Sequence, residues 1–244
     1  MSTGGATLNV RGLGKSFRGL RAVHDVGFDV PAGAIHALIG PNGAGKTTTF
    51  NMIAGVFPPS AGTVQLDGRT ITGLRPDRVC DAGIGRTFQI VKPFPGLSVL
   101  DNVLIGALKR EPDVSRARDR ALTVLRELGL HDKRAMTASN LTLPDRKRLE
   151  VARALATQPR LLLLDEVMAG LRPTETDQMV AFLRELNART GLTILLIEHV
   201  MRAVMALSQH IVVLNYGEKI AEGSPEAIAR DQRVLDVYLG QDAH

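Results

Sequence analysis

The sequence predicts an α/β fold, and three features indicate it. A short apolar run at residues 35–39 leads directly into a glycine-rich segment at 40–47, and a helical pattern follows from Thr47 to Ala54. Two further unbroken apolar runs, at 161–164 and 193–197, are typical of strands that are covered on both faces. Buried strands alternating with helices predict a largely parallel sheet with helices packed against it.

The segments around these features complete the predicted fold. Residues 8–30 alternate between apolar and polar side chains with glycines between them, which predicts two or three strands of an antiparallel edge. From about residue 98 to 156 the strand pattern disappears, and one-sided apolar stripes predict helices. We expect these helices at 98–108, 115–128 and 145–156, a strand and turn at 63–68, a helix at 173–190, a hairpin at 211–221 and two short helices near the C-terminus.

The glycine-rich segment fits G-x-x-x-x-G-K-[ST], the phosphate-binding loop of nucleotide-binding proteins. Its glycines let backbone amides and a helix N-terminus point at phosphate oxygens, while the lysine adds a positive charge and Thr47 offers a hydroxyl to Mg²⁺. An ordinary glycine turn before a helix is the alternative interpretation. The pattern predicts that a nucleoside triphosphate, which the family resemblance described below implies is ATP, binds with Mg²⁺ and that its phosphates contact Asn42, Gly43, Ala44, Gly45, Lys46, Thr47 and Thr48.

Five side chains elsewhere are candidates for the same site. Asp165 and Glu166 end a buried strand, where Asp165 suits a hold on Mg²⁺ and Glu166 suits a general base for water; helix capping is the alternative. His199 follows the next buried strand and can donate to the γ-phosphate region, although a lone histidine is more often structural. Gln89 can touch Mg²⁺ or position water, or be merely solvated. Phe17 can stack on a purine or pack in the core.

Composition limits the other classes of function. The 244 residues carry a formal net charge of +5, but the basic residues are scattered and aromatic residues make up only 4% of the chain, which argues against nucleic-acid binding. The densest basic cluster, at 146–148, is typical of a solvated helix face. The single cysteine, Cys80, excludes an internal disulfide. We expect no secretory signal, and no apolar run reaches the ~18 residues of a membrane-spanning helix.

In this order along the chain, the motifs resemble those of the nucleotide-binding subunits of ATP-binding cassette (ABC) transporters. The resemblance covers about residues 8–240 and implies one nucleotide-binding domain, with an ATPase core at about 8–92 and 157–240 and an inserted helical subdomain at about 93–156. It implies that Phe17 stacks on adenine, that Gln89 lies in the loop that meets a transmembrane subunit, that Asp165 and Glu166 form the acidic pair, and that His199 is the switch histidine. Segment 169–173 resembles the dimer-contact loop.

Within this family the chain is similar to the ATPases of branched-chain or hydrophobic amino-acid importers, through segments 86–89, 138–141, 152–159, 195–199 and the tail 237–240. This implies a second ATPase subunit of a different sequence, two transmembrane permeases, a solute-binding protein and a cytoplasmic position on the inner face of the membrane. Lipopolysaccharide export is the nearest alternative, since its ATPase has a similar loop and tail. A soluble non-transport ABC ATPase and a regulatory module without catalysis are further alternatives.

One segment departs from the family. In place of the signature Leu-Ser-Gly-Gly-Gln the chain has Leu-Thr-Leu-Pro-Asp at 141–145. Pro144 has no amide hydrogen to offer a γ-phosphate, and Asp145 is expected to place a negative charge beside an anionic ligand. Pro144 is nevertheless a good first helical residue. The resemblance implies that each ATP lies between one chain's phosphate loop and its partner's signature, so we expect a heterodimer with asymmetric hydrolysis. Val167 stands where the family usually has proline.

Overall fold

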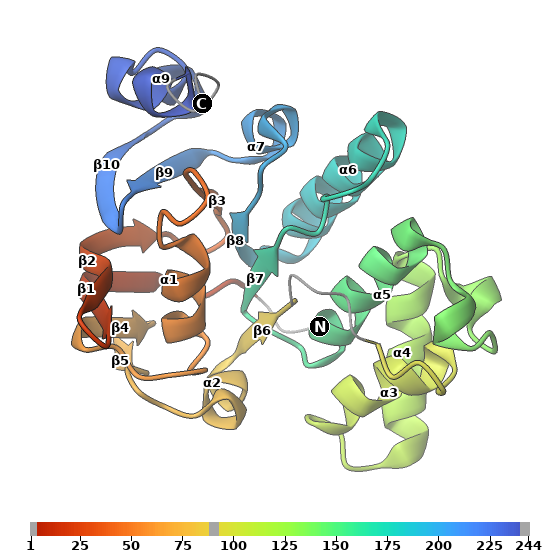
Figure 1. The fold of residues 1–244 in the computed structure, drawn as a ribbon. Helices are drawn as coiled ribbons and strands as arrows, with labels where there is room; N and C mark the ends of the chain where they lie inside the picture. Colours follow the sequence, from red (N-terminus) through yellow and green to blue (C-terminus); the bar gives the residue numbers. More distant parts are fainter. Residues whose placement is uncertain (1–3, 88–92, 240–244) are drawn as a thin grey trace.

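The computed structural model describes residues 4–87 and 93–239 and confirms the α/β fold (Figure 1). Its main sheet has six strands in the order β10-β9-β3-β8-β7-β6. The five strands from β9 to β6 are parallel, and β10 pairs antiparallel with β9. Their bounds are β3 Ile35–Ile39, β6 Ile84–Arg86, β7 Leu161–Asp165, β8 Thr193–Ile197, β9 His210–Asn215 and β10 Glu218–Gly223.

A second sheet of four strands forms the predicted antiparallel edge. Its order is β2-β1-β4-β5, with β1 Leu8–Phe17, β2 Leu20–Val30, β4 Ala61–Leu66 and β5 Arg69–Thr70. All three pairings are antiparallel. Register shifts between Val10 and Ser16 of β1 follow from the glycines in this strand, which bend it and increase its twist.

The main sheet is buried on both faces, which explains its unbroken apolar strands. Successive side chains of β7 alternate between two hydrophobic clusters. Leu162 and Leu164 pack with the helices, whereas Leu161 and Leu163 pack with the antiparallel sheet and α1 (Lys46–Ile53). A strand between two cores has no polar face, so periodicity alone would not distinguish it from a helix, and its shortness settles the assignment.

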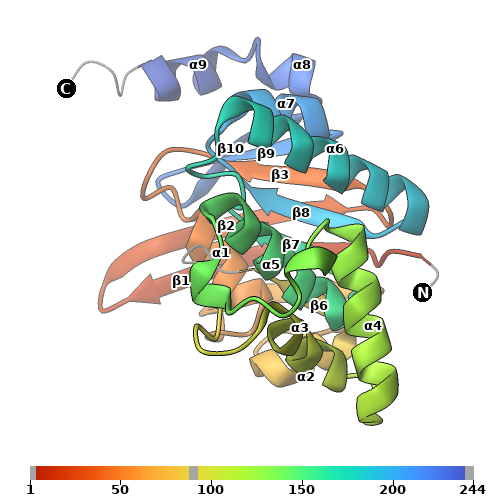
Figure 2. The same cartoon turned by 90° about the vertical axis from the view of Figure 1, so that its right-hand side faces the viewer.

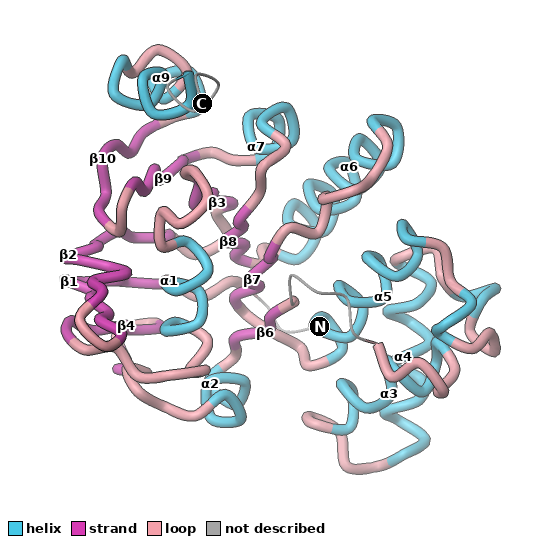
Figure 3. The backbone as a smooth tube through the Cα atoms, in the orientation of Figure 1, coloured by secondary structure: helices cyan, strands magenta, loops and turns pink. Residues whose placement is uncertain are grey.

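The predicted helices form, and three of them gather at one side of the molecule (Figures 1 and 2). They are α3 (Val99–Leu108), α4 (Val114–Glu127) and α5 (Leu143–Ala156). α5 begins two residues earlier than we predicted, because Thr142 caps it and Pro144 fits its first turn. Figure 3 shows this helical side next to the strands. The other helices that match predictions are α6 (Pro173–Thr190), α8 (Pro225–Ile228) and α9 (Gln232–Leu239).

Two helices were not predicted. α2 (Pro76–Ala82) has a proline in its first turn and ends at Gly83 with a left-handed φ of 109°, and both signals were readable from the sequence. α7 (Met201–Leu207) is a short helix between two strands. Within residues 4–87 and 93–239, no helix combines the length and apolar character that crossing a bilayer requires.

Candidate functional site

The glycine-rich loop joins β3 to α1 at the carboxyl edge of the main sheet, where open α/β sheets place ligands. Its tight path depends on glycine. A Cβ on Gly40 would lie 2.1 Å from the carbonyl oxygen of Leu214, and one on Gly45 would lie 2.8 Å from that of Ala22. Both glycines also have left-handed φ angles, 146° and 95°. The loop therefore cannot carry side chains at these positions without moving away from its neighbours.

Lys46 begins α1 and is held inside the loop. Its Nζ donates hydrogen bonds to the carbonyl oxygens of Gly40, at 2.5 Å, and Pro41, at 2.8 Å. Only 6% of the residue is exposed, and this burial lowers the pKa of its ammonium, against the attraction of Glu166 and Asp165. The positive charge is thus fixed beside the amides at the start of α1, where a phosphate would be recognised.

A pocket of about 200 Å³ brings most of the predicted site together. Its lining includes Ala22, which sequence reasoning missed, together with Glu166 and His199 from the ends of two other strands. The phosphate-loop residues in the lining are Asn42, Gly43, Ala44, Gly45, Lys46, Thr47 and Thr48. The fold thus places the phosphate-binding loop beside a carboxylate and an imidazole that are more than 100 positions away in sequence.

Glu166 and His199 contact each other directly. The His199 Nε2 lies 2.8 Å from Glu166 Oε1, so its N–H can donate to the carboxylate and fix the orientation of both groups. Glu166 has a left-handed φ of 51°, which is uncommon for a residue with a side chain. Its amide donates to the carbonyl oxygen of Ile197 at 2.9 Å and holds this conformation. Strain of this kind concentrates at functional sites.

Asp165 is buried, does not line this pocket, and pairs with a residue that we did not single out. Arg86, the last residue of β6, donates to Asp165 Oδ2 at 3.1 Å and to Asn51 Oδ1 at 2.7 Å. Burial raises the pKa of the Asp165 carboxyl, although Arg86 opposes that shift. Its Oδ1 is buried and has no hydrogen-bond partner among the residues described. Arg86 and Asp165 come together only because β6 and β7 are neighbours in the sheet. No local pattern in the sequence therefore indicates this pair.

The arrangement fits a magnesium ion held jointly with a nucleotide. Among the described residues, no group of three or more His, Cys, Asp or Glu side chains is placed to hold a metal alone. Mg²⁺ is typically bound by one or two carboxylates together with substrate phosphates and water. The unsatisfied Asp165 Oδ1 and the Thr47 hydroxyl provide two suitable oxygens.

Phe17 does not line this pocket. Phe17 ends β1 with 42% of its surface exposed and packs edge to face on Phe57, with ring centroids 5.4 Å apart. The Lys15 ammonium lies over both rings. One part of the Phe17 ring therefore packs while another is open to a ligand. Gln89, predicted to contact both Mg²⁺ and water, lies outside the described residues.

The divergent signature segment forms a helix cap. The Thr142 hydroxyl donates to Asp145 Oδ2 at 2.8 Å, and the Lys133 ammonium forms an ion pair with the same carboxylate. We expected Asp145 to face an anionic ligand, but only 5% of the residue is exposed and its charge is compensated. Thr142 and Leu143 are instead the exposed side chains of this segment, with Leu143 at 44%, and Leu143 adjoins Gly170. The segment thus stabilises α5 and presents an apolar group at its tip.

We expected the basic cluster at 146–148 to be solvated, but the structure shows it to be solvated only in part. Lys147 is only 5% exposed and points toward the loop after β7, close to Glu198, which is 1% exposed. Neither residue was predicted to belong to the site. Their partners lie 19 and more positions away in the sequence, so helical periodicity could not reveal them.

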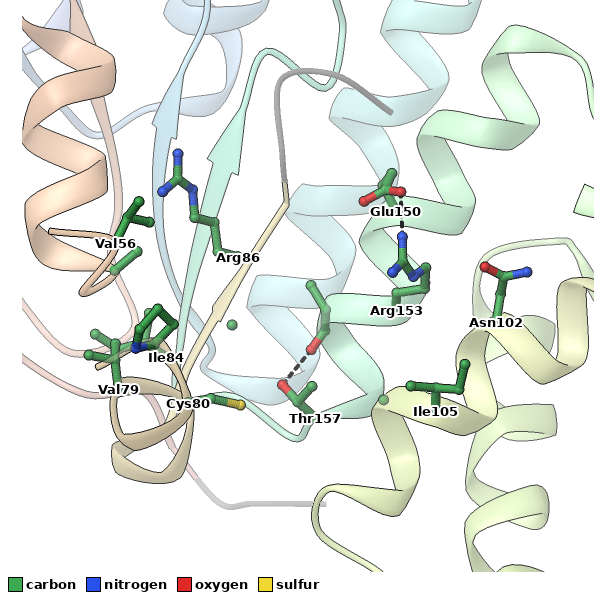
Figure 4. Close-up of a pocket in the computed structure, with 15 residues that line it drawn as sticks. Val56, Val79, Cys80, Ile84, Arg86, Asn102, Ile105, Glu150, Arg153 and Thr157 are labelled. Carbon is green, nitrogen blue, oxygen red and sulfur yellow. Dashed lines mark hydrogen bonds and ion pairs between the residues drawn. The ribbon is translucent and has the colours of Figure 1, made fainter. Parts of the chain in front are cut away.

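A separate groove of about 410 Å³ lies between β6 and the helical side of the molecule (Figure 4). Arg86 and Cys80 line one wall. Glu150 and Arg153 of α5 line the other and form an ion pair at 2.7 Å, drawn in Figure 4. Most of the remaining lining is aliphatic, namely Ala54, Val56, Pro76, Val79, Ile84, Ile105 and Ala154. An apolar groove with a few polar groups is a typical binding surface.

Comparison with known proteins finds relatives that match nearly the whole chain. The family described as ABC transporter matches residues 23–169, and that described as branched-chain amino acid ATP-binding cassette transporter matches 218–244. The chain is 41% identical to LivG of Escherichia coli, a high-affinity branched-chain amino acid transport ATP-binding protein, over 96% of this chain and 98% of LivG. It is 37% identical to the lipopolysaccharide export ATP-binding protein LptB of the same species, over 97% and 98%. A solved ABC transporter cassette in its ADP conformation superposes with a TM-score of 0.88 at 30% identity, covering 96% and 99%.

Proposed function

The chain belongs to the ABC transporter family, and from this premise we propose that it is the ATP-hydrolysing subunit that powers import of branched-chain amino acids or related small hydrophobic or amide solutes. The observation that carries the substrate class is the 41% identity to LivG over nearly the whole of both chains. The match of residues 218–244 to a branched-chain amino acid transporter family supports the same assignment at the C-terminus. Export of lipopolysaccharide is the less favoured candidate, because LptB is less similar at 37%.

For the hydrolysis itself, we propose a role for each residue of the pocket. Mg²⁺ bound with the nucleotide supplies charge neutralisation at the β- and γ-phosphates. Thr47 and Asp165 would hold this ion, and Gln89 would contact it from the adjoining loop. Lys46 and the amides of residues 42–48 would bind the phosphates. The carboxylate of Glu166 would accept a proton from the attacking water, because it lines the pocket beside the phosphate loop.

His199 would keep that carboxylate in place. Its contact with Glu166 Oε1, at 2.8 Å, supports a positioning role in addition to donation toward the γ-phosphate. Phe17 would stack on the adenine ring with the part of its surface that Phe57 leaves open.

We propose that the groove beside β6 receives a transmembrane permease. Arg86 lines the groove at the end of β6, and Gln89, in the loop expected to meet the permease, follows three residues later. The aliphatic lining favours an apolar segment of the partner, and the Glu150–Arg153 pair offers polar contacts at its edge. We further propose that residues 93–156 act as one helical subdomain against a core at 8–92 and 157–240, with the groove between them.

We propose a second, different ATPase chain as the dimer partner. The cap at 142–145 turns its polar groups on one another and exposes Leu143, so it offers little to the γ-phosphate in a partner's site. The pocket on this chain carries both Glu166 and His199, so it would hydrolyse ATP with the partner's signature. A pair with one such site would turn over asymmetrically. The permeases, a solute-binding protein and attachment to the inner face of the membrane complete the proposal.

Uptake and ATP turnover of the assembled transporter test the function. Vesicles that contain the complex should accumulate radiolabelled leucine only when ATP is supplied, and Glu166→Gln should abolish both uptake and turnover. Turnover without uptake of any branched-chain amino acid would reject the proposed substrate class. Asymmetry is tested by comparing Glu166→Gln with the same change at the equivalent acid of the partner. Equal losses of turnover from the two changes would contradict it.

A further inference from the structure

Lys147 joins the helical side of the molecule to the segment that carries Glu166. It lies on α5, and its Nζ donates a hydrogen bond of 2.7 Å to the carbonyl oxygen of Glu166. The side chain is buried, with 5% of the residue exposed. Burial lowers the pKa of the Lys147 ammonium, and the strongest opposing attraction comes from Glu198. An ammonium group desolvated in this way is stabilised only where acceptors and opposite charges surround it.

Glu198 holds the same segment from the other side. Its Oε1 accepts a hydrogen bond of 2.8 Å from the amide of Met168, two residues after Glu166. Glu198 follows directly after β8 and precedes His199, whose ring contacts the Glu166 carboxylate. The loop that carries Glu166 is therefore fastened at its main chain by Lys147 and Glu198 and at its side chain by His199.

α5 connects three parts of the molecule along its length: the cap, the Glu166 segment and the groove. Its N-terminal end is the cap at 142–145, which we propose faces the dimer partner. Lys147 follows within the next turn and contacts the Glu166 segment. Glu150 and Arg153 follow at the groove. Because a helix behaves as a rigid rod over this distance, a displacement of α5 at either end moves the Lys147 ammonium relative to the Glu166 carbonyl.

We propose that Lys147, which with Glu198 holds the main chain around Glu166, is a positioning residue that sets the Glu166 backbone according to the position of α5. The proposal rests on the proposed function, in which Glu166 is the general base and the groove receives the permease. Lys147 does not line the nucleotide pocket, so it acts on the placement of the base and leaves nucleotide binding unchanged. Displacement of a catalytic group by about 1 Å costs up to about 100-fold in rate, which sets the scale of the expected effect.

The test is steady-state ATP hydrolysis by the assembled transporter with Lys147→Met, Lys147→Arg and Arg148→Ala. Arg148 is the matched control, because it is the next residue of the same helix and carries the same charge but donates to Gln178 of α6, at 2.9 Å. We expect Lys147→Met to lower kcat by at least about tenfold and to leave KM for ATP within about twofold. Lys147→Arg should recover most of kcat, since a guanidinium can also donate to the carbonyl, and Arg148→Ala should match the wild type.

Three results would overturn the proposal: an unchanged kcat in Lys147→Met, equal losses in Lys147→Met and Arg148→Ala, or a rise in KM that accounts for the whole effect. If Lys147→Met yields no folded subunit, Glu198→Gln decides, because it keeps an acceptor for the Met168 amide while removing the charge that attracts Lys147. Its kcat should fall with KM unchanged, and an unchanged kcat rejects the proposal. A wild-type complex without ATP turnover would instead reject the proposed function.

Discussion

Replacing Glu198 by glutamine should make the subunit more stable at high pH and little different at low pH. Burial raises the pKa of the Glu198 carboxyl to about 7, from an ordinary value of 4.5. Below pH about 4.5 the group is protonated in both the folded and the unfolded chain and adds no pH dependence. Between pH about 4.5 and 7 it ionises only on unfolding, so a rising pH favours the unfolded chain. Above pH about 7 the carboxyl is ionised in both the folded and the unfolded chain, and the loss of stability is complete.

The magnitude follows from the two pKa values. A difference of about 2.5 at about 1.4 kcal/mol for each unit of pKa amounts to about 3 kcal/mol in the free energy of unfolding. Most of this, about 2–3 kcal/mol, falls between pH 5 and pH 8. The introduced glutamine side chain keeps an oxygen for the Met168 amide, so the comparison isolates the charge. The stability of Glu198→Gln relative to the wild type should therefore rise by about 2–3 kcal/mol over this range.

Urea unfolding of the purified subunit at pH 5, 6, 7 and 8 measures this difference. When both chains also carry Lys147→Met, the free energies of unfolding with Glu198 and with Gln at position 198 should differ more, because the Lys147 ammonium lowers the pKa of Glu198 in the wild type. Parallel free-energy curves for wild type and Glu198→Gln would refute the reasoning. They would mean that the carboxyl is hydrated when the chain is folded.

Three further changes test other parts of the structure. Gly106→Ala should destabilise the subunit by about 1–3 kcal/mol in thermal unfolding, because its Cβ would lie 2.6 Å from the carbonyl oxygen of Arg153; Gly96→Ala, with no atom within 4 Å, is the control, and equal effects would contradict the packing argument. Phe17→Ala should weaken ATP binding by about tenfold in calorimetry if the ring stacks on adenine, and an unchanged Kd would leave it a packing residue only. Asp145→Ala should cost about 1–2 kcal/mol of stability, because the Thr142 hydroxyl and the Lys133 ammonium lose their carboxylate partner, whereas a stability equal to the wild type would show that these contacts are dispensable.

Local patterns predicted most of the fold because local physics determines those elements. The helix from Pro173 to Thr190 has the predicted bounds, since a proline starts it and Gly191, with a left-handed φ of 66°, ends it. The early start of α5 was also encoded, by the Thr142 cap and Pro144, although we placed the start at Asp145. Where several signals act on one short segment, the capping residue determines where the helix begins.

The candidate site could be predicted only in part. The phosphate loop is contiguous in sequence, so its residues were identified together, and Glu166 and His199 follow buried strands at the same sheet edge. Arg86 and its partner Asp165 are 79 positions apart, and only the pairing of β6 with β7 brings them together. The partners of Lys147 come from another part of the fold in the same way. A charged side chain that is buried by distant segments carries no local signal of its burial.

Arg86 contributes both to the groove beside β6 and to the proposed cation site. Its side chain stands in the wall of the apolar groove, and its guanidinium neutralises the carboxylate proposed to hold the cation. An occupant of the groove that shifts this guanidinium alters the negative charge available to the metal and so alters the affinity for the magnesium nucleotide. Thermodynamic linkage then requires the reverse, with bound nucleotide changing the grip on that occupant by an equal factor. Arg86 would thus couple occupancy of the groove to the affinity for the nucleotide.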